Sequence, residues 1–393
     1  MKRLGKALLS LIVIAVFGVL IFKYSYKLAP DDFITDRTTF IYINKNINRE
    51  KLRKFEETFG TEKIAEKDIV EKIKNICLLS QSKIYSSRFD VVGIVDMGAY
   101  HPLMLMKLKK YFNFREDNFY ELKDEYKDEL GISQREEIFL KPHRGLFFIG
   151  GDTEKIDEII FNKNKRSLKA VKILNEKAES GLGALMLNQE RERLFGIDRI
   201  IISGDTKGNK VFLDGCIYGD NEIIKDLNVQ PEKRRMNKYI TSNRLYISTA
   251  NLKKMDTFIL RALSYKAKSS HKTNLVQELF AKGFADMISE LNGEMVIDLE
   301  NGNYLLGLKS SQNAEMFVEY LKNDENINIE KDIEGNIYIC IGRDTFVPVE
   351  NPKIVEDNQF LTGEIDTYYG KVQADGFYAP DRLRIKAEIE LEK

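Results

Sequence analysis

The chain has 393 residues, and its 61 basic and 61 acidic side chains leave a formal net charge of zero. This balance provides no global field to attract nucleic acid, so a nucleic-acid-binding role is not expected. A hydrophobic content of 43% and a charged content of 31% are typical of a folded globular body. A chain of this length is expected to form two or three domains whose cores need no disulfide or metal.

The N-terminus holds the most apolar stretch of the sequence, because no residue from Ala7 to Phe22 is charged. This length approaches the roughly 20 residues that cross a bilayer core. Basic residues before the stretch favour a cytoplasmic N-terminus. No small-x-small site follows, so an uncleaved signal anchor is favoured over a cleaved signal peptide. We therefore predict a transmembrane helix within residues 1–30 and a single-pass protein of the inner (cytoplasmic) membrane, with the bulk of the chain extracytoplasmic or periplasmic.

The rest of the chain contains an internal repeat. The motif "IGGDT" at Ile149–Thr153 recurs as "IGRDT" at Ile341–Thr345, each after a short apolar strand. The offset between matched positions drifts along the chain, which suits duplicated domains with loop insertions. The other matched segments are Thr38–Phe59 with Ser242–Leu263, and Ser82–Phe112 with Gly293–Asn323.

Further elements follow from local patterns. We predict a second helix in each half, near Lys67–Leu79 and Thr273–Leu291, and a hairpin that turns at Lys207–Asn209. The strict alternation from Leu383 to Leu391 indicates a strand with one solvent-exposed face. The predicted fold class is α+β, with two similar halves, each an antiparallel sheet packed against helices, after the N-terminal transmembrane helix. The predicted boundaries are residues 31–220 for the first half, 221–241 for a linker and 242–393 for the second half.

The stretch "FFIGGDTEK" is the most site-like motif. A phosphate-binding loop needs a Gly-Lys-Ser/Thr sequence at the start of its helix, and this stretch lacks one. The residues are better explained by a strand that ends in glycine, with Asp152 or Thr153 capping a helix over Glu154–Phe161. We therefore predict no cofactor site here.

Other signatures of chemistry are also missing from the sequence. The three histidines are isolated, and there is no HExxH, CxxC or GxSxG motif. The cysteines, Cys77, Cys216 and Cys340, each lie in an apolar run and are predicted to pack as small hydrophobic side chains. No catalytic, cofactor-binding or metal-binding residue is predicted, and the protein is not expected to be an enzyme.

Two basic clusters are the candidate contact residues for an acidic partner or anionic lipid surface. The alternative is that they form a solvated helix face and a solvated linker. Their members are Lys163, Lys165 and Arg166 in the first cluster, and Lys233, Arg234, Arg235 and Lys238 in the second.

The anchor followed by repeated strand-strand-helix units, such as Leu291–Leu321, resembles uncharacterised bacterial families of membrane-anchored extracytoplasmic proteins. These families are known mainly as domains of unknown function, and the resemblance implies no catalytic residues. We expect a non-enzymatic envelope protein that binds or scaffolds a partner, held to the membrane by its N-terminal helix. Two alternatives stay open: a carrier or sensor of a lipid or other apolar ligand, and a hydrolase with dispersed acidic residues. A carrier predicts a continuous apolar cavity of several hundred cubic ångströms that is open to solvent, whereas a scaffold predicts filled cores and an exposed apolar or charged patch.

Overall fold

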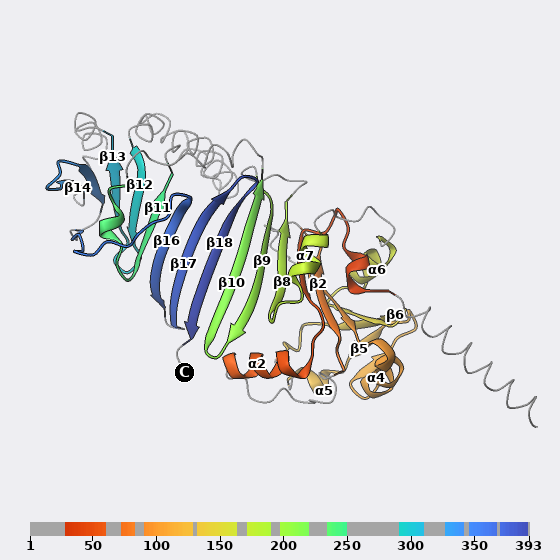
Figure 1. Ribbon diagram of the computed structural model, residues 1–393. Helices are drawn as coiled ribbons and strands as arrows, with labels where there is room; N and C mark the ends of the chain where they lie inside the picture. Colours follow the sequence, from red (N-terminus) through yellow and green to blue (C-terminus); the bar gives the residue numbers. More distant parts are fainter. Residues whose placement is uncertain are drawn as a thin grey trace, which may run out of the picture. The chain divides into compact units, whose positions relative to one another are not determined.

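The computed structural model describes residues 28–59, 72–82, 90–128, 132–162, 171–189, 197–219, 234–249, 291–309, 327–341, 346–367 and 370–391 (Figure 1). Nearly all of the predicted N-terminal helix, the predicted helix at Thr273–Leu291 and most of the predicted linker lie outside these residues. The chain divides into two compact units. Unit 1 comprises Met1–Asn188 and Ser203–Asp205, and unit 2 comprises Gln189–Ile202 and Thr206–Lys393.

The prediction of a membrane-spanning helix is corrected. In the part of the chain that the structure describes, no helix has the length and the apolar character that a membrane span requires. The longest described helix, α2 (Arg49–Phe59), has 11 residues, whereas a span needs about 20. The single-pass inner-membrane location is therefore not supported, and the apolar stretch Ala7–Phe22 lies outside the described residues.

The predicted fold class is wrong. The described strands belong to one antiparallel sheet of 18 strands, and the described α-helices are few and short. The sequence predicted a separate sheet for each half, packed against helices. The difference arises because β10 (Lys210–Gly219) pairs with β18 (Arg382–Leu391) along most of their length. Strands that would form exposed edges of two separate sheets are thereby paired.

Unit 1 is built on eight strands in the order β8-β1-β2-β3-β7-β6-β5-β4, all antiparallel. Their bounds are β1 (Phe40–Asn44), β2 (Asn75–Ser80), β3 (Val92–Asp96), β4 (Phe112–Phe114), β5 (Tyr120–Leu122), β6 (Phe139–His143), β7 (Leu146–Gly150) and β8 (Gly183–Asn188). Besides α2, the described helices are α4 (His101–Leu108), α5 (Asp124–Lys127), α6 (Thr153–Phe161) and α7 (Val171–Lys177).

The core of unit 1 follows from the strand register. Cross-strand partners point to the same face of a sheet, and Ile43, Cys77, Ile94 and Phe148 are partners in turn across β1, β2, β3 and β7. All four side chains are fully buried. Cys77, Cys216 and Cys340 are all buried, which confirms the predicted packing role of the cysteines.

Two local predictions in unit 1 have opposite outcomes. The carboxylate of Asp152 accepts hydrogen bonds from the backbone N–H groups of Glu154 and Lys155 at the start of α6, which confirms the predicted cap. The predicted helix at Lys67–Leu79 is wrong over its described end, because Asn75–Ser80 forms β2 between β1 and β3. A short apolar run such as "NICLLS" has no period that separates a helix from a central strand.

Unit 2 contains ten antiparallel strands. The order from β10 outward is β10-β18-β17-β16-β11-β12-β13-β15-β14, and β9 pairs with the other side of β10. The remaining bounds are β9 (Ile197–Lys207), β11 (Arg244–Ser248), β12 (Leu291–Asp298), β13 (Asn303–Leu308), β14 (Ile327–Lys331), β15 (Ile337–Ile341), β16 (Gln359–Thr367) and β17 (Gly370–Ala379). The hairpin β9–β10 turns at the predicted residues, since β9 ends at Lys207 and β10 begins at Lys210.

A common strand order recurs in the two units. In unit 1 the run is β8-β1-β2-β3-β7-β6, and in unit 2 it is β16-β11-β12-β13-β15-β14. When the six strands of each run are numbered by their order in the chain, both runs have the same spatial order, 6-1-2-3-5-4. The buried triplet Leu146–Phe148 in β7 also has its counterpart in Tyr338–Cys340 of β15.

Candidate functional site

One face of the unit 2 sheet carries rows of uncharged side chains that cross most of its strands. A first row links cross-strand partners on every strand from β14 to β10. Its members are Ile329, Ile339, Leu306, Met295, Ile247, Leu361, Gly376, Ile385 and Gly215. Because partners share a face, these residues form one line across the sheet.

A second row runs beside the first, two residues further along each strand. Its members are Tyr304, Ile297, Leu245, Gly363, Ala374, Ala387 and Leu213. On the long strands a third row follows, made of Ile365, Val372, Ile389 and Val211. We call these three rows the apolar face. With strands about 4.8 Å apart, the first row is on the order of 38 Å long.

The apolar face is only partly covered. Ile339 is fully buried and Val211 is 5% exposed, but Tyr304 and Ile329 are 40% and 42% exposed. Most of the other side chains, including Ile385 and Ile389 on β18, are half-buried. The described part of unit 2 consists of strands, loops and one short 3₁₀ turn, η5 (Asn237–Tyr239). A long uncharged surface that is incompletely covered is a candidate ligand-binding surface.

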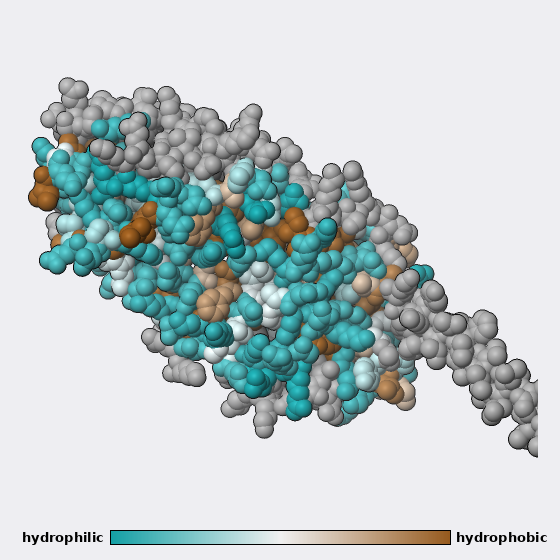
Figure 2. Space-filling model, viewed as in Figure 1, coloured by the Kyte–Doolittle hydropathy of each residue, from teal (hydrophilic) through white to brown (hydrophobic). Residues whose placement is uncertain are grey.

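On the long strands the opposite face is charged. Asp375, Lys386 and Asp214 are cross-strand partners on β17, β18 and β10. The Lys210 ammonium lies 2.6 Å from the Glu388 carboxylate in a neighbouring row. This face therefore suits water, and Figure 2 shows a largely hydrophilic described surface with small, separate hydrophobic groups. The two faces of one set of strands thus differ sharply in polarity.

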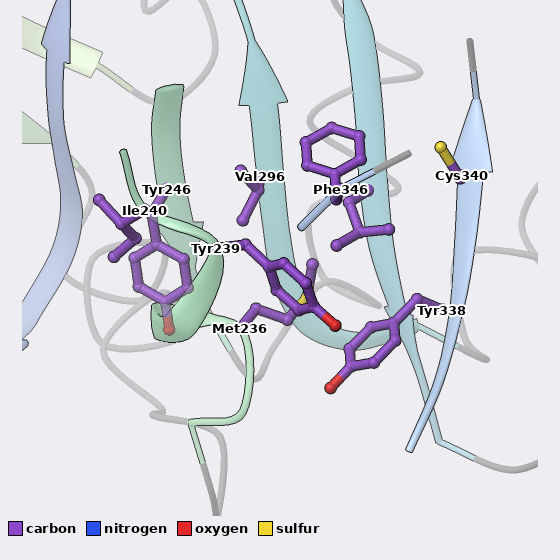
Figure 3. Packing of buried hydrophobic residues seen from close by; sticks show 9 residues of the cluster. Met236, Tyr239, Ile240, Tyr246, Val296, Tyr338, Cys340 and Phe346 are labelled. Carbon is purple, nitrogen blue, oxygen red and sulfur yellow. The ribbon is translucent and has the colours of Figure 1, made fainter. Parts of the chain in front are cut away.

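On β11 to β15 the opposite face is filled by the chain itself. Figure 3 shows Met236 and Tyr239, from the segment before β11, packed toward Tyr338 of β15. The rings of Tyr239 and Tyr338 lie edge to face, with centroids 5.5 Å apart. Burial and the nearby Asp332 carboxylate raise the pKa of Tyr239 to about 12. This side of the sheet is a closed core.

Glu294 on β12 fixes the segment before β11 to this core. The carboxylate is 1% exposed. It accepts hydrogen bonds from the backbone N–H groups of Arg235 at 2.8 Å and Met236 at 3.0 Å, and from the Tyr246 hydroxyl at 3.0 Å. Burial raises the pKa of Glu294, and the donated hydrogen bonds only partly oppose this shift. Since its acceptor capacity is used inside the fold, the carboxylate serves as a structural acceptor.

Asp332 plays a similar part at the turn between β14 and β15. One carboxylate oxygen accepts hydrogen bonds from the Lys238 ammonium at 2.7 Å, the Asn336 amide at 2.8 Å and the Tyr338 hydroxyl at 2.8 Å. Burial acts to raise the pKa of Asp332, but these hydrogen bonds together outweigh it and lower the pKa. The turn is thereby tied to the 3₁₀ turn that carries Lys238.

The described members of the second basic cluster are engaged within the fold. The Arg234 guanidinium donates to the backbone carbonyls of Glu356, Asp357 and Gln359, the last at 2.8 Å. The Arg235 guanidinium donates to the Asn336 amide oxygen at 2.6 Å, and Lys238 binds Asp332. Lys163, Lys165, Arg166 and Lys233 lie outside the described residues. A role of these clusters in partner contact stays a prediction.

The sequence alone did not predict the apolar face as a continuous surface. The alternation from Leu383 to Leu391 did predict one apolar and one charged face for β18. The strand also has the predicted bounds to within a residue. The pairings of β18 with β17 and with β10 determine which strands continue this apolar face. No local sequence signal specifies those pairings. Among the described residues, no group of three or more His, Cys, Asp or Glu side chains is placed to hold a metal ion.

Comparisons with known proteins add little to this geometry. No protein-family model and no curated protein matches the chain. Among solved structures, the chain is similar to crystal form IV of TP0453, with 7% identity, 49% of this chain and 81% of that chain covered, and a TM-score of 0.33. Crystal form I has 9% identity, with 49% of this chain and 79% of that chain covered and a TM-score of 0.31. Crystal form III has 10% identity, with 53% of this chain and 90% of that chain covered and a TM-score of 0.32. Similarity this weak carries no argument about function, and the resemblance to membrane-anchored extracytoplasmic families is not confirmed.

Proposed function

We propose that the protein is a non-enzymatic binding protein that holds a lipid or another long-chain apolar ligand on the apolar face of unit 2. One observation carries the proposal: the uncharged rows from β14 to β10 continue without a charged residue and stay incompletely covered. Removing such a surface from water is favourable by roughly 25 cal/mol for each Å² buried.

The dimensions of the apolar face favour an extended ligand over a compact one. The rows are long in the direction across the strands and only a few residues deep along them. Small residues such as Ala374, Ala387 and Gly215 lie in the part formed by the long strands. A flexible hydrocarbon chain lying across the strands would run along the rows and contact successive strands without needing a polar partner, because apart from the Tyr304 hydroxyl these side chains offer no strong hydrogen-bonding group.

The buried acids of unit 2 support a binding role over catalysis. A general acid or base must have its carboxylate within reach of a substrate. Glu294 and Asp332 instead accept hydrogen bonds from backbone and side-chain donors that hold the 3₁₀ turn and the β14–β15 turn in place. Burial accounts for the raised pKa of Glu294, and the donated hydrogen bonds account for the lowered pKa of Asp332.

The test adds one charge to either face of the long strands. Ala387→Glu places a carboxylate on the apolar face, and Gln373→Glu places the same charge on the opposite face of the neighbouring strand. Each full-length variant is titrated with a fluorescent long-chain fatty acid, and lipids that co-purify with it are identified by mass spectrometry. We expect Ala387→Glu to weaken binding by at least about tenfold, because a buried charge is costly next to hydrocarbon, while Gln373→Glu binds like the unmodified protein.

Unfolding in urea separates lost binding from lost folding. If Ala387→Glu fails to fold, Ala387→Ser adds a hydroxyl with little change in volume and is expected to weaken binding several-fold. The proposal is contradicted if the unmodified protein carries no lipid and binds no fatty acid. Equal binding by the two charged variants would also contradict it.

A further inference from the structure

A second surface lies on unit 1, where helix α4 is apolar on two sides. Its inner side packs into the core: Met104 is 3% exposed, and His101 stacks on Phe147 with ring centroids 4.3 Å apart. On the outer side Leu103 is 61% exposed and Met106 is 71% exposed. A helix that needed only one apolar side to pack would carry polar residues at these outer positions.

The exposed residues form a stripe. Tyr100, at 43% exposure, precedes α4 in the 3₁₀ turn η2 (Gly98–Tyr100). Tyr100, Leu103 and Met106 are three residues apart, a spacing that places helical residues on one face. A small hydrophobic group is visible near the position of α4 at the lower right of Figure 2. We call these three residues the α4 stripe.

Lysines surround the α4 stripe without acidic counterparts. Lys107, Lys109 and Lys110 are exposed, and the Lys72 ammonium lies 4.9 Å from the centroid of the Tyr100 ring. The sequence contains no acidic residue from Met97 to Arg115. Within the described residues, no ion pair joins the three exposed lysines to a carboxylate. The stripe and its lysines thus combine exposed apolar groups with an uncompensated positive charge.

We propose that the α4 stripe docks on the surface of an anionic lipid bilayer. Leu103 and Met106 project from a convex helix, so they enter the boundary between headgroups and acyl chains, while the lysines reach the lipid phosphates. Tyr100 has the amphipathic ring that is enriched at this level of a bilayer. The contact is peripheral and needs no membrane-spanning helix.

A bilayer suits this surface better than a folded protein partner does. A protein would need a groove of matching shape, rimmed by acids, to receive a convex stripe with lysines beside it. A bilayer is deformable and presents many anionic groups at once, so charge complementarity alone selects it. Each lysine near an anionic surface contributes about fivefold to the partition coefficient.

The experiment uses a local reporter in the full-length protein. An environment-sensitive fluorophore is attached at Leu103→Cys and, as a matched control, at Ile354→Cys, where the native side chain in the loop before β16 is 88% exposed. The native cysteines are buried, so labelling is directed to the new thiol. Vesicles contain phosphatidylcholine alone or with about one third phosphatidylserine. We expect a blue shift at position 103 with anionic vesicles only, and no shift at position 354.

A charge variant tests the lysines. Replacing Lys107, Lys109 and Lys110 by Gln in the labelled protein is expected to weaken binding to anionic vesicles by about 100-fold. Removing the same charge elsewhere, with Lys210, Lys371 and Lys386 all changed to Gln, is expected to leave binding nearly unchanged. The two lysine variants have the same apolar segments. A difference in vesicle binding between them therefore reports the contribution of the lysines beside α4.

Several outcomes would overturn the inference. These are an equal shift with neutral vesicles, an equal loss in the two lysine variants, or no shift at position 103. A photocrosslinker at Met106 that yields only protein adducts in cells would assign the stripe to a protein partner instead. None of these readouts depends on the apolar face, so this inference and the proposed function can fail independently.

Discussion

Two acidic residues of unit 2 have pKa values that shift in opposite directions. Glu294 is fully buried and its pKa is raised, whereas Asp332 is only partly buried and its pKa is lowered. The difference lies in the depth of burial and in the donors. Asp332 accepts from the Lys238 ammonium, a charge-assisted bond. The hydrogen bonds to Glu294 come from neutral backbone, phenol and amide groups, which do not repay the cost of burying its charge.

Substitution of Glu294 separates the roles of its charge and its acceptor atoms. Glu294→Ala leaves the N–H groups of Arg235 and Met236 and the Tyr246 hydroxyl without their acceptor, so the free energy of unfolding should fall by about 3–5 kcal/mol. Glu294→Gln keeps one acceptor oxygen and removes the buried charge, so the loss should be near 1 kcal/mol. Urea unfolding at pH 7 measures both values.

The raised pKa of Glu294 also gives a pH dependence. Its folded-state pKa lies above the ordinary value of 4.5. The stability that the group contributes is therefore fully present below 4.5 and is lost as the pH rises through the folded-state pKa. The unmodified protein should gain stability relative to Glu294→Gln when the pH is lowered from 7 toward 4.5. A gap that stays constant, or moves the other way, would contradict the burial argument.

At the scale of the element, Gly370 is required at the start of β17. Its φ is +133°, and a Cβ there would overlap the backbone carbonyl oxygen of Glu390 on β18. Gly370→Ala should therefore lower the free energy of unfolding by about 3 kcal/mol or more.

Gly208, in the turn between β9 and β10, is a matched control because its φ is +63° and nothing lies within 4 Å of a Cβ. Gly208→Ala should cost only about 1 kcal/mol. Similar losses for the two variants in thermal or urea unfolding would count against this account.

Element predictions succeeded where a local cause determines the structure. Asp152 caps α6 because its carboxylate reaches two N–H groups within three residues. The turn at Gly208 and the alternation along β18 are likewise determined by residues that are adjacent in the sequence. The prediction failed at Asn75–Ser80, whose strand conformation depends on partners in β1 and β3. Sequence patterning specifies a face or a cap, whereas long-range pairing decides the ambiguous segments.

At the scale of the whole molecule, the sequence could not specify the single large sheet. The sheet depends on the pairing of β10 with β18, in which Lys210 lies opposite Glu390. Neither strand carries a local signal for the other: β18 alternates apolar and charged residues, whereas β10 has runs of consecutive apolar residues. The same pairing extends the apolar face from β18 to β10. The candidate binding surface was therefore as unpredictable as the topology that creates it.

A native cysteine allows the β10–β18 pairing to be tested with one substitution. Cys216 lies directly opposite Arg384 in the register of the two strands. Arg384→Cys should form a disulfide with Cys216 under a mild oxidant, because directly opposed residues have Cβ atoms about 4.5–5.5 Å apart and need only a small adjustment. Leu383→Cys is the control, since its side chain points to the opposite face. Peptide mass spectrometry after oxidation should find Cys216 linked to the introduced cysteine in the first variant and no link to Cys216 in the second. Equal yields in the two variants, or no link in either, would refute the pairing and with it the continuity of the apolar face onto β10.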